Sequence, residues 1–541
     1  MNKKTTQTDY TAYGDGYQLC LPLNTEIKIP GDDPVRLLSA IIERMSLKEL
    51  YATYSESGRN EYSPRIMLKI CVYGYMRKII STRELEKACK ENINFMYLLG
   101  GKPAPDHNTI ARFRSAHLSK CQDEIQAAMT RVLIEMNEVS FTESAVFIDG
   151  TKIESVGNRY KFVWKKSSEK QYLKLQGSMK EKLPEMVRSS GLRFYIGEEI
   201  KIKHLKKLRK KVVQAMKEQE ISMISGKGRH KHPLQRLQEQ IDEWIDRNRR
   251  YLQDIRICGD RNSYCKTDRD ATFMRMKEDQ MRNGQLKPGY NVNIAAASEY
   301  ILGTYVSSDR TDQKTTIPFM EKLRKYYPVH RVVYDSGYES EENYRYFAEH
   351  PELDLYVKPS NYEQQKKRKY RTDISRRENM TYDKEYDRYT CANGRLLENI
   401  GIKRQKNANG YVSEKKVYEC SSCAGCPMKE QCIRAKSSTP LEKRNKRLEV
   451  AEYFAEQRAR MEEKIESEEG KLLRMNRSIQ AEGVFGYVKT DLQFRRFALK
   501  GFEKVGAEWT LLAMAFNVLK LHHKTQNGRL GTHLFPLTET A

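Results

Sequence analysis

Ala145-Val-Phe-Ile-Asp149-Gly-Thr-Lys152 and Arg331-Val-Val-Tyr-Asp335-Ser-Gly-Tyr338 are two short apolar runs, and each of them ends in an aspartate. Short runs rich in Val, Ile and aromatic side chains are typical of buried β-strands. A glycine follows each aspartate within two residues and would permit a sharp exit from the strand. The pattern therefore predicts two strands that each end in a carboxylate. An aspartate before a glycine is also a common turn residue, so either one alone could have a purely structural role.

Further strand patterns surround the second run. Apolar strand-like segments occur at 291–295 and 301–306, a helical pattern follows at 314–326, and one more strand is expected at 353–358. Strands interleaved with helices in this order are typical of a mixed sheet with helical crossovers. The predicted fold class is therefore α/β (α+β).

The stretch Gln480-Ala-Glu482-Gly-Val-Phe-Gly-Tyr-Val-Lys489 supplies a third acid. It is expected to be helical, which places Glu482 and Lys489 two turns apart on the same face. Three carboxylates on rigid elements could hold two Mg²⁺ ions about 4 Å apart, because Mg²⁺ prefers oxygen ligands. Such a pair of ions activates an attacking oxygen and stabilises a leaving one at phosphorus. Asp149, Asp335 and Glu482 are thus candidate catalytic and metal-binding residues, and Lys489 could reach a bound phosphate.

The chain is strongly basic. Its 541 residues carry 97 Lys and Arg against 72 Asp and Glu, a formal net charge of +25. An excess of this size favours a polyanionic partner such as nucleic acid, because neutralised phosphates release counterions. A merely soluble basic protein is the alternative. The length indicates about two to four domains. No apolar run resembles a signal peptide or a membrane span, so we expect a cytoplasmic protein without a membrane partner.

Residues 1–125 have helical patterns. Asp33-Pro34 is a typical helix start, and the short basic segment 106–114 follows a turn rich in glycine and proline. A helix, a turn and an arginine-bearing helix are the parts of a helix-turn-helix reader, whose second helix enters the major groove. Arg112 and Arg114 are accordingly candidate DNA-binding residues. An all-helical packing or dimerisation module is the alternative.

Two stretches interrupt the strand pattern. Residues 166–255 are highly charged, with apolar residues at helical spacing, and from Leu234 onward steps of three and four alternate as in a coiled coil. They predict an inserted helical hairpin. Its basic segment 206–211 could lie along DNA, although most such runs are solvated faces. Residues 366–440 are polar and rich in tyrosine, contain an Asn393-Gly394 turn, and predict inserted β-hairpins.

Four cysteines cluster within the second insertion with the spacing C-x₂-C-x₂-C-x₅-C. This spacing suits a structural zinc site with four thiolate ligands. An iron–sulfur cluster, which also uses C-x₂-C-x₂-C, and reduced cysteines without a metal are the alternatives. Cys391, at the Asn-Gly turn, could replace one ligand. The four candidate zinc ligands are Cys420, Cys423, Cys426 and Cys432.

The acidic stretches resemble motifs of DDE transposases from bacterial insertion sequences, whose catalytic domains have an RNase H-like fold. Asp-Gly-Thr-Lys at 149–152 resembles the first acidic motif of that family and Asp-Ser-Gly-Tyr at 335–338 the second. Residues 482–489 resemble the third, in which six residues separate the acid from the lysine. Thr267-Asp-Arg-Asp-Ala271 and Gly289-Tyr-Asn291 are similar to accessory motifs between the first two acids.

The resemblance extends to the N-terminal helices, where 63–67 and 105–114 are similar to one lineage of the family. It implies an RNase H-like mixed sheet with helices, preceded by an all-helical domain and interrupted by the two insertions. The implied domains are a helix-turn-helix-like DNA-binding domain at 1–125; an RNase H-like catalytic domain at 140–165, 256–365 and 470–525; a helical hairpin at 166–255; a β-hairpin and zinc-knuckle region at 366–440; and a tail at 526–541.

The third motif departs from the family in one respect. Many members have a tyrosine seven residues before the acid and an arginine four before it, where this chain has Met475 and Ser478. Arg477 lies one position from the expected arginine and could replace it if the start of the helix is irregular. Together with Lys152 and Lys489, Arg477 is therefore a candidate DNA-binding residue.

The resemblance implies a transposase that binds the terminal inverted repeats of an insertion sequence. Asp149 would bridge two Mg²⁺ (or Mn²⁺) ions, with Asp335 and Glu482 each holding one. Water would cut the strand at the element's end, and the freed 3′-hydroxyl would attack target DNA without a covalent enzyme intermediate. The implied partners are double-stranded DNA (transposon ends and target) and a second copy of the chain in a homodimer. A catalytically inactive DNA-binding regulator and a metal-dependent nuclease of the same fold are the alternatives.

Overall fold

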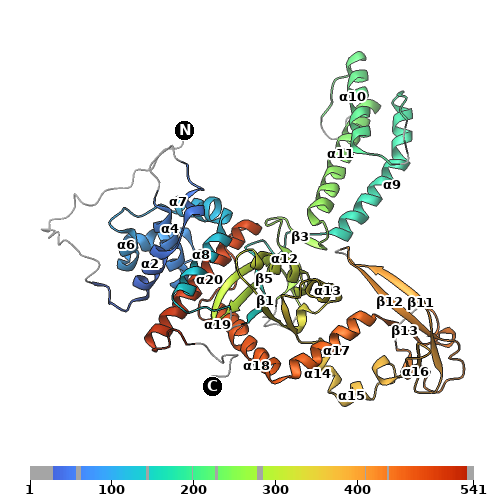
Figure 1. Cartoon of the computed structure of the whole chain (residues 1–541). Helices are drawn as coiled ribbons and strands as arrows, with labels where there is room; N and C mark the ends of the chain where they lie inside the picture. The colour runs from blue at the N-terminus through green and yellow to red at the C-terminus, as the bar shows by residue number, and fades with distance from the viewer. Residues whose placement is uncertain are drawn as a thin grey trace.

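The computed structural model describes residues 28–55, 62–141, 145–195, 197, 199–225, 230–276, 284–407, 410–434 and 438–532. The first 27 residues of the predicted N-terminal domain and residues 533–541 of the predicted tail lie outside these ranges. Within them the chain forms a mixed sheet surrounded by helices, a helical arm and a second, antiparallel sheet (Figure 1). The α/β class expected from the sequence is confirmed.

A six-stranded mixed sheet forms the centre of the molecule. Its strands are β1 (Val146–Glu154), β4 (Thr272–Arg275), β5 (Leu286–Ala297), β6 (Tyr300–Ser307), β7 (Arg331–Tyr334) and β8 (Asp354–Val357). Strand β1 is central and pairs antiparallel with β5 and parallel with β7. β8 continues the parallel side, whereas β4 and β6 both pair antiparallel with β5. The strands expected around both aspartates are therefore present.

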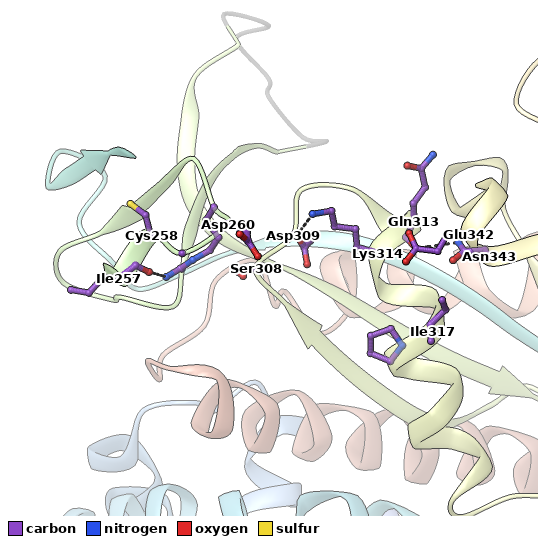
Figure 2. A pocket seen from close by; sticks show the side chains of 13 residues that line it. Ile257, Cys258, Asp260, Ser308, Asp309, Gln313, Lys314, Ile317, Glu342 and Asn343 are labelled. Carbon is purple, nitrogen blue, oxygen red and sulfur yellow. Dashed lines mark hydrogen bonds and ion pairs between the residues drawn. The ribbon is translucent and has the colours of Figure 1, made fainter. Parts of the chain in front are cut away.

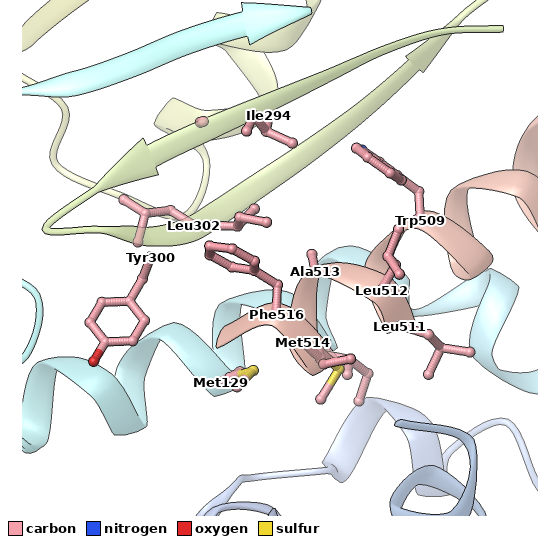
Figure 3. Close-up of a cluster of buried hydrophobic side chains, with 14 of the residues drawn as sticks. Met129, Ile294, Tyr300, Leu302, Trp509, Leu511, Leu512, Ala513, Met514 and Phe516 are labelled. Carbon is pink, nitrogen blue, oxygen red and sulfur yellow. The ribbon is translucent and has the colours of Figure 1, made fainter. Parts of the chain in front are cut away.

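Helix α20 (Phe502–Gln526) makes the core continuous. It packs on β6 and also against the N-terminal helices α4 (Pro64–Met76) and α8 (Gln122–Glu135). Figure 3 shows Trp509 and Phe516 of α20 directed toward the sheet. Because both sides of this helix are covered, its residues are buried nearly all round, as its uniformly apolar sequence predicted.

The N-terminal helices and the sheet share one hydrophobic core. Asp33 caps the first described long helix as expected, since its carboxylate accepts a 2.8 Å hydrogen bond from the amide of Val35. The expected domain boundary at residue 125 falls inside α8, and the buried cluster continues from α8 into the sheet. The remaining N-terminal elements are α2 (Pro34–Arg44), α3 (Lys48–Tyr51), α5 (Thr82–Glu91), α6 (Ile93–Leu99), α7 (His107–Arg112), the π-turn η2 (Phe113–His117) and the 3₁₀ turn η3 (Leu118–Lys120).

The first insertion forms an arm of three helices, not the expected hairpin of two. They are α9 (Lys165–Ser189), α10 (Ile202–Glu218) and α11 (Pro233–Cys258), and they stand away from the body in Figure 1. They bury a hydrophobic cluster of their own. The root of the arm is a two-stranded ribbon of β2 (Phe162–Trp164) and β3 (Ser263–Cys265). Most of the chain between the first two acidic motifs therefore lies outside the central sheet.

The second insertion forms a five-stranded antiparallel sheet in the order β13-β12-β11-β10-β9. The Asn393-Gly394 turn predicted from the sequence joins two of its strands, and Gly394 has the positive φ of 70° that such a turn requires. The strands are β9 (Thr381–Asp383), β10 (Arg388–Thr390), β11 (Leu396–Lys406), β12 (Val412–Cys420) and β13 (Arg447–Val450).

Two long helices return the chain from this second sheet to the first. They are α17 (Glu452–Glu466) and α18 (Glu468–Arg477), followed by the π-turn η8 (Ser478–Glu482) and α19 (Gly483–Thr490). The other elements are η4 (Asp312–Thr315), α12 (Thr316–Arg324), η5 (Ser336–Tyr338), α13 (Glu341–Glu349), α14 (Tyr362–Gln365), α15 (Arg368–Arg371), η6 (Arg377–Asn379), α16 (Lys429–Cys432) and η7 (Leu441–Lys443).

No helix in the described part of the chain is long and apolar enough to cross a bilayer.

Candidate active site

Asp149 and Asp335 lie on neighbouring parallel strands. The register pairs Ile148 with Tyr334, so the two aspartates are the next residues along each strand. Asp335 directly follows β7, as expected. Asp149 does not end its strand, because β5 continues to pair with β1 as far as Glu154 after β7 has ended. The expected strand end at Asp149 is thus wrong, although its carboxylate lies where the parallel pairing stops.

Gly150 permits close packing and not the sharp exit expected from the sequence. It lies inside β1, and a Cβ at this position would be only 2.8 Å from the hydroxyl of Tyr338 and 3.0 Å from Oδ1 of Asp312. Its amide donates a 2.8 Å hydrogen bond to Oδ1 of Asp149. A larger residue would displace this segment of β1 and, with it, the carboxylate of Asp149.

The guanidinium of Arg477 brings the three acids together. Its Nη1 lies 3.7 Å from Oδ2 of Asp149, and its Nη2 lies 3.9 Å from Oδ1 of Asp335. The same Nη2 donates a 2.5 Å hydrogen bond to Oε1 of Glu482. Three segments far apart in the sequence therefore place their carboxylates around one cation. The side chain of Arg477 is 12% exposed, whereas those of Asp335 and Glu482 are 45% and 52% exposed, so the cluster opens to solvent on the side of the latter two.

A π-turn explains how Arg477 can take this place. Residues Ser478–Glu482 form one turn with i→i+5 geometry between α18 and α19. Residues five apart then lie above one another, as residues four apart do in an α-helix. Arg477, five residues before Glu482, consequently occupies the position that an arginine four residues before the acid would take in a regular helix. Ser478 also contacts the acid, donating 3.1 Å from Oγ to Oε2 of Glu482.

Lys489 also comes to the site, as the helical spacing predicted. Its ammonium donates a 2.7 Å hydrogen bond to Oγ1 of Thr151, two residues after Asp149 on β1. This bond ties α19 to the central strand beside the first acid. Lys152 is half-buried on the same strand. Lys152 therefore belongs to β1 itself, whereas Lys489 comes from the third acidic motif and reaches β1 through Thr151.

Arg112 and Arg114 have opposite environments. Arg112 is exposed at the end of α7, where it can meet a partner. Arg114 is 1% exposed and donates to the carbonyl of Ile80 at 2.8 Å and to the hydroxyl of Tyr75 at 2.7 Å. It also lies 3.7 Å from the buried carboxylate of Glu508 in α20. The expectation that Arg114 contacts DNA is therefore corrected: its guanidinium joins the N-terminal helices to the last helix.

The donor set of the candidate site suits a hard cation. Carboxylate oxygens are the ligands that Mg²⁺ and Mn²⁺ prefer, and the half-exposed Asp335 and Glu482 leave room for water ligands. In the arrangement described, Arg477 lies among the three acids, and no group of three or more His, Cys, Asp or Glu within the described residues forms a metal cage on its own. The three carboxylates are therefore suitable ligands for Mg²⁺ or Mn²⁺, while in this structure they are arranged around the guanidinium of Arg477.

Four of the five cysteines of the second insertion gather in one small core, whereas Cys426 is half-buried and is not part of it. Cys420 and Cys423 are buried in it, and Cys391 and Cys432 pack against it. The amide of Lys446 donates to Sγ of Cys423 at 3.2 Å. Burial raises the pKa of the Cys420 and Cys432 thiols. Among the described residues, these cysteines do not form a group of three or more ligands that could hold a metal ion. A zinc site therefore stays a prediction.

A separate cavity of about 570 Å³ lies at the root of the arm (Figure 2). It is lined by residues that follow α11, such as Asp260, and by residues near the start of α12 and α13, such as Lys314 and Glu342. Lys314 is paired with Asp309 at 3.8 Å. The three acids around Arg477 do not line this cavity, so it is separate from the candidate active site.

Two comparisons with protein families identify the class of protein. Residues 390–522 match the model of the transposase DDE domain, and residues 23–116 match that of a transposase domain, DUF772. Both matched models are those of transposase domains, and together they cover less than half of the chain. More particularly, the two matches together indicate a DDE transposase of an insertion sequence, which confirms the resemblance seen in the motifs. The first match includes Glu482 and Lys489, whereas Asp149 and Asp335 lie between the two matched segments. No curated protein and no solved structure matches the chain.

Proposed function

We propose that this chain binds the terminal inverted repeats of its insertion sequence and catalyses metal-dependent DNA cleavage and strand transfer with Asp149, Asp335 and Glu482. The observation that carries the proposal is the convergence of the three carboxylates on Arg477. A scaffold or regulator needs no such cluster, because gathering like charges at one place is unfavourable unless a cation offsets them.

The strand order supports an RNase H-like catalytic domain. Strands β6, β5 and β1 form an antiparallel meander, and β7 and β8 follow on the other side of β1 in parallel. This strand order fits the RNase H-like fold that the resemblance implies. On this proposal the domain consists of 140–165, 256–365 and 470–525, with the arm and the second sheet as insertions. The N-terminal helices to about residue 125 would then bind the repeats, with the exposed Arg112 as a contact.

In the proposed reaction Asp149, Asp335 and Glu482 would hold two Mg²⁺ or Mn²⁺ ions. These ions would supply activation of the attacking oxygen and neutralise charge at phosphorus. Lys489, held beside β1, would bind a non-bridging phosphate oxygen. First, water attacks the phosphorus at the element's end, the bond to the 3′-oxygen breaks, and that oxygen leaves with a proton as a 3′-hydroxyl. This hydroxyl then attacks a target phosphodiester, so one phosphodiester bond replaces another without a covalent enzyme intermediate.

The proposed partners follow from this chemistry. Double-stranded DNA is bound as transposon ends and as target, in the bacterial cytoplasm, and two copies of the chain pair two ends. The net charge of +25 fits a partner of this kind. A zinc ion on Cys420, Cys423, Cys426 and Cys432 would stabilise the second sheet, whose core is small. Its test is the metal content of the purified protein, measured before and after a chelator.

The deciding experiment measures Mg²⁺-dependent cleavage and joining on DNA that carries the element's own ends. The native chain is compared with Asp149→Ala, Asp335→Ala and Glu482→Ala, and with Glu468→Ala as a control, since Glu468 is highly exposed on α18 and distant in role from the cluster. We expect each of the three variants to lose both steps while still binding the ends, and the control to keep them. Native activity in any of the three would remove that acid from the site.

The same assay separates the two alternatives. A catalytically inactive regulator would bind the ends tightly without any cleavage by the native chain. A nuclease of the same fold would cut, but it would not join pre-cleaved ends that carry a 3′-hydroxyl to target DNA. All three acids are present and gathered, which argues against the regulator.

A further inference from the structure

The outward face of helix α10 in the arm is a row of lysines. Of the seventeen residues of α10, seven are Lys or Arg and one is acidic. The neighbouring α11, by contrast, has equal numbers of basic and acidic residues. Helix α9 has seven basic and three acidic residues, so the excess of positive charge in the arm is largest on α10.

The lysines lie opposite the buried side of the helix. Leu205, Leu208, Val212 and Met216 are buried in the core of the arm. At about 100° per residue, five lysines fall within a stripe about 100° wide on the opposite side. All five are exposed. They are Lys203, Lys206, Lys207, Lys210 and Lys217.

Carboxylates do not compensate this stripe. Arg209, at the edge of the helix, pairs with Asp242 of α11 at 2.5 Å. No carboxylate in the described part of the chain lies within 4.0 Å of the ammonium groups of the five stripe lysines. Five like charges along one helix repel one another, and the repulsion is relieved when a polyanion binds.

The arm holds this stripe away from the candidate active site. Asp242, the partner of Arg209, lies sixteen residues before the end of α11 at the root, which corresponds to about 24 Å along the helix. The root in turn follows β1, the strand that carries Asp149. The same length of duplex DNA contains about 7 base pairs, at 3.4 Å each.

We infer that the lysine stripe of α10 binds the phosphate backbone of duplex DNA outside the segment that is cut. This inference rests on the proposed function for its ligand. The contact is independent of base sequence, because ammonium groups at the end of flexible chains meet phosphates and do not read base edges. The arm therefore adds affinity for long duplexes and anchors the DNA that flanks the reacting strand.

The test compares two quadruple variants of the full chain. In the first, stripe lysines become glutamine: Lys203→Gln, Lys207→Gln, Lys210→Gln and Lys217→Gln. In the control, four exposed lysines of α9, which are interspersed with glutamates, are changed in the same way: Lys170→Gln, Lys174→Gln, Lys180→Gln and Lys182→Gln. The net charge changes equally in both. Circular dichroism confirms that each arm stays helical.

Equilibrium binding is measured against salt for duplexes that extend about 5 or about 20 base pairs beyond the cleavage point. For the long duplex we expect the stripe variant to lower the slope of log K against log salt by about 1 for each lysine in contact. For the short duplex it should behave as the native chain does, and the α9 variant should do so with both.

An unchanged slope for the stripe variant on long DNA, or equal losses for both variants, would overturn the inference. Binding is measured without cleavage, so failure of the stripe leaves the proposed function untouched. Failure of the proposed function would instead appear as a native chain that neither cuts nor joins element ends.

Discussion

Arg477 is the residue on which the geometry of the candidate site depends. It contacts all three acids, yet the family pattern places its arginine at Ser478. The π-turn after Arg477 accounts for the difference. Because this turn contains one additional residue, the residue five before Glu482 lies where the residue four before it would lie in a regular helix. The extra residue and the shifted arginine are thus two parts of one local change.

We predict that Arg477→Ala lowers cleavage by about 10²-fold or more, since it removes the cation that orients the acids. Arg477→Lys should restore only part of the activity, because one compact ammonium replaces the two separate nitrogens of the guanidinium that face the three carboxylates. The exchange Arg477→Ser with Ser478→Arg keeps the composition but rotates the guanidinium about 100° around the helix, so it should be as inactive as the alanine variant.

Two readouts distinguish this positioning role from a purely structural one. The Mg²⁺ concentration for half-maximal cleavage should fall in Arg477→Ala, because the three acids then attract the metal more strongly. Its melting temperature should stay close to that of the native chain. Near-native cleavage by the exchanged variant would contradict the importance of the register.

Arg114 illustrates a second arginine whose role depends on a distant segment. Burial raises the pKa of Glu508, and the neighbouring Arg114 opposes this effect. We predict that Arg114→Ala destabilises the fold by about 3–5 kcal/mol, because Glu508 is left buried without its cation. Arg112→Ala, at an exposed position two residues away, should leave the melting temperature unchanged and weaken binding to the terminal repeats. Loss of DNA binding by a fully stable Arg114→Ala would contradict this assignment.

The site could be predicted from sequence only where the signal is local. Asp149 and Asp335 follow compact apolar runs, and Glu482 has Lys489 at helical spacing, so each was identified within a few residues. The burial of Arg114 depends on α20, which begins almost four hundred residues later, and nothing near 114 in the sequence records it. The central place of Arg477 depends on a π-turn. The only sign of this turn in the sequence is that the arginine lies one position away from where the family pattern places it.

At the scale of elements, the spacing of apolar residues predicted the helices and strands that have a regular apolar face. Apart from β4, which was missed, the strands of the central sheet and helices α10 and α11 have clear apolar patterns and were predicted. Helix α9 was missed because its buried positions, such as Leu175 and Met179, recur only every fourth residue among charged ones, and Pro184 lies inside it. A helix that buries a narrow stripe against one neighbour leaves little signal in its sequence.

The second sheet contains a carboxylate with a pH-dependent role. Asp387, in the turn between β9 and β10, accepts hydrogen bonds of 2.6 Å from the Tyr418 hydroxyl and 2.7 Å from the Tyr382 hydroxyl. These bonds, together with those from Asn399 and Lys416, hold the pKa of Asp387 well below its usual range. Because the folded pKa is depressed, the stabilisation is present above the unfolded pKa of about 3.9 and is lost as pH falls through the folded value.

We therefore predict that Asp387→Asn speeds hydrogen exchange of the β11 and β12 amides at neutral pH. Below about pH 4 the difference from the native chain should shrink, because the carboxyl of Asp387 takes up a proton in the unfolded state before it does so in the folded one. Glu385→Gln, an exposed neighbour, is the matched control and should exchange as the native chain does. A difference that is constant with pH would show that the charge of Asp387 is unimportant.

At the scale of the whole molecule, the N-terminal helices and the last described helix form one unit. The segments matched by the two transposase families, 23–116 and 390–522, are separated by more than 270 residues, yet α4 of the first packs against α20 of the second. The hydroxyl of Tyr75 donates to Glu508 at 3.1 Å across this contact. The expected independent N-terminal domain is instead continuous with the sheet, because α20 contributes to both.

The arm, unlike the N-terminal helices, has a hydrophobic core separate from that of the sheet. Its buried residues pack against one another in a separate cluster, and it is joined to the body through β2 and β3. Trp164 and Ser263 are paired across this ribbon, and the amide of Lys165 donates to the carbonyl of Asn262 at 2.9 Å. Residues 165–262 can therefore be replaced by an Asn-Gly turn that closes the hairpin.

We expect the shortened chain to keep its main melting transition within about 2–4 °C and to cleave short duplexes, while losing the salt-dependent part of its affinity for long ones. A shortened chain that is soluble but melts far lower, as followed by calorimetry, would show that the arm supports the central sheet and is not an appended DNA contact.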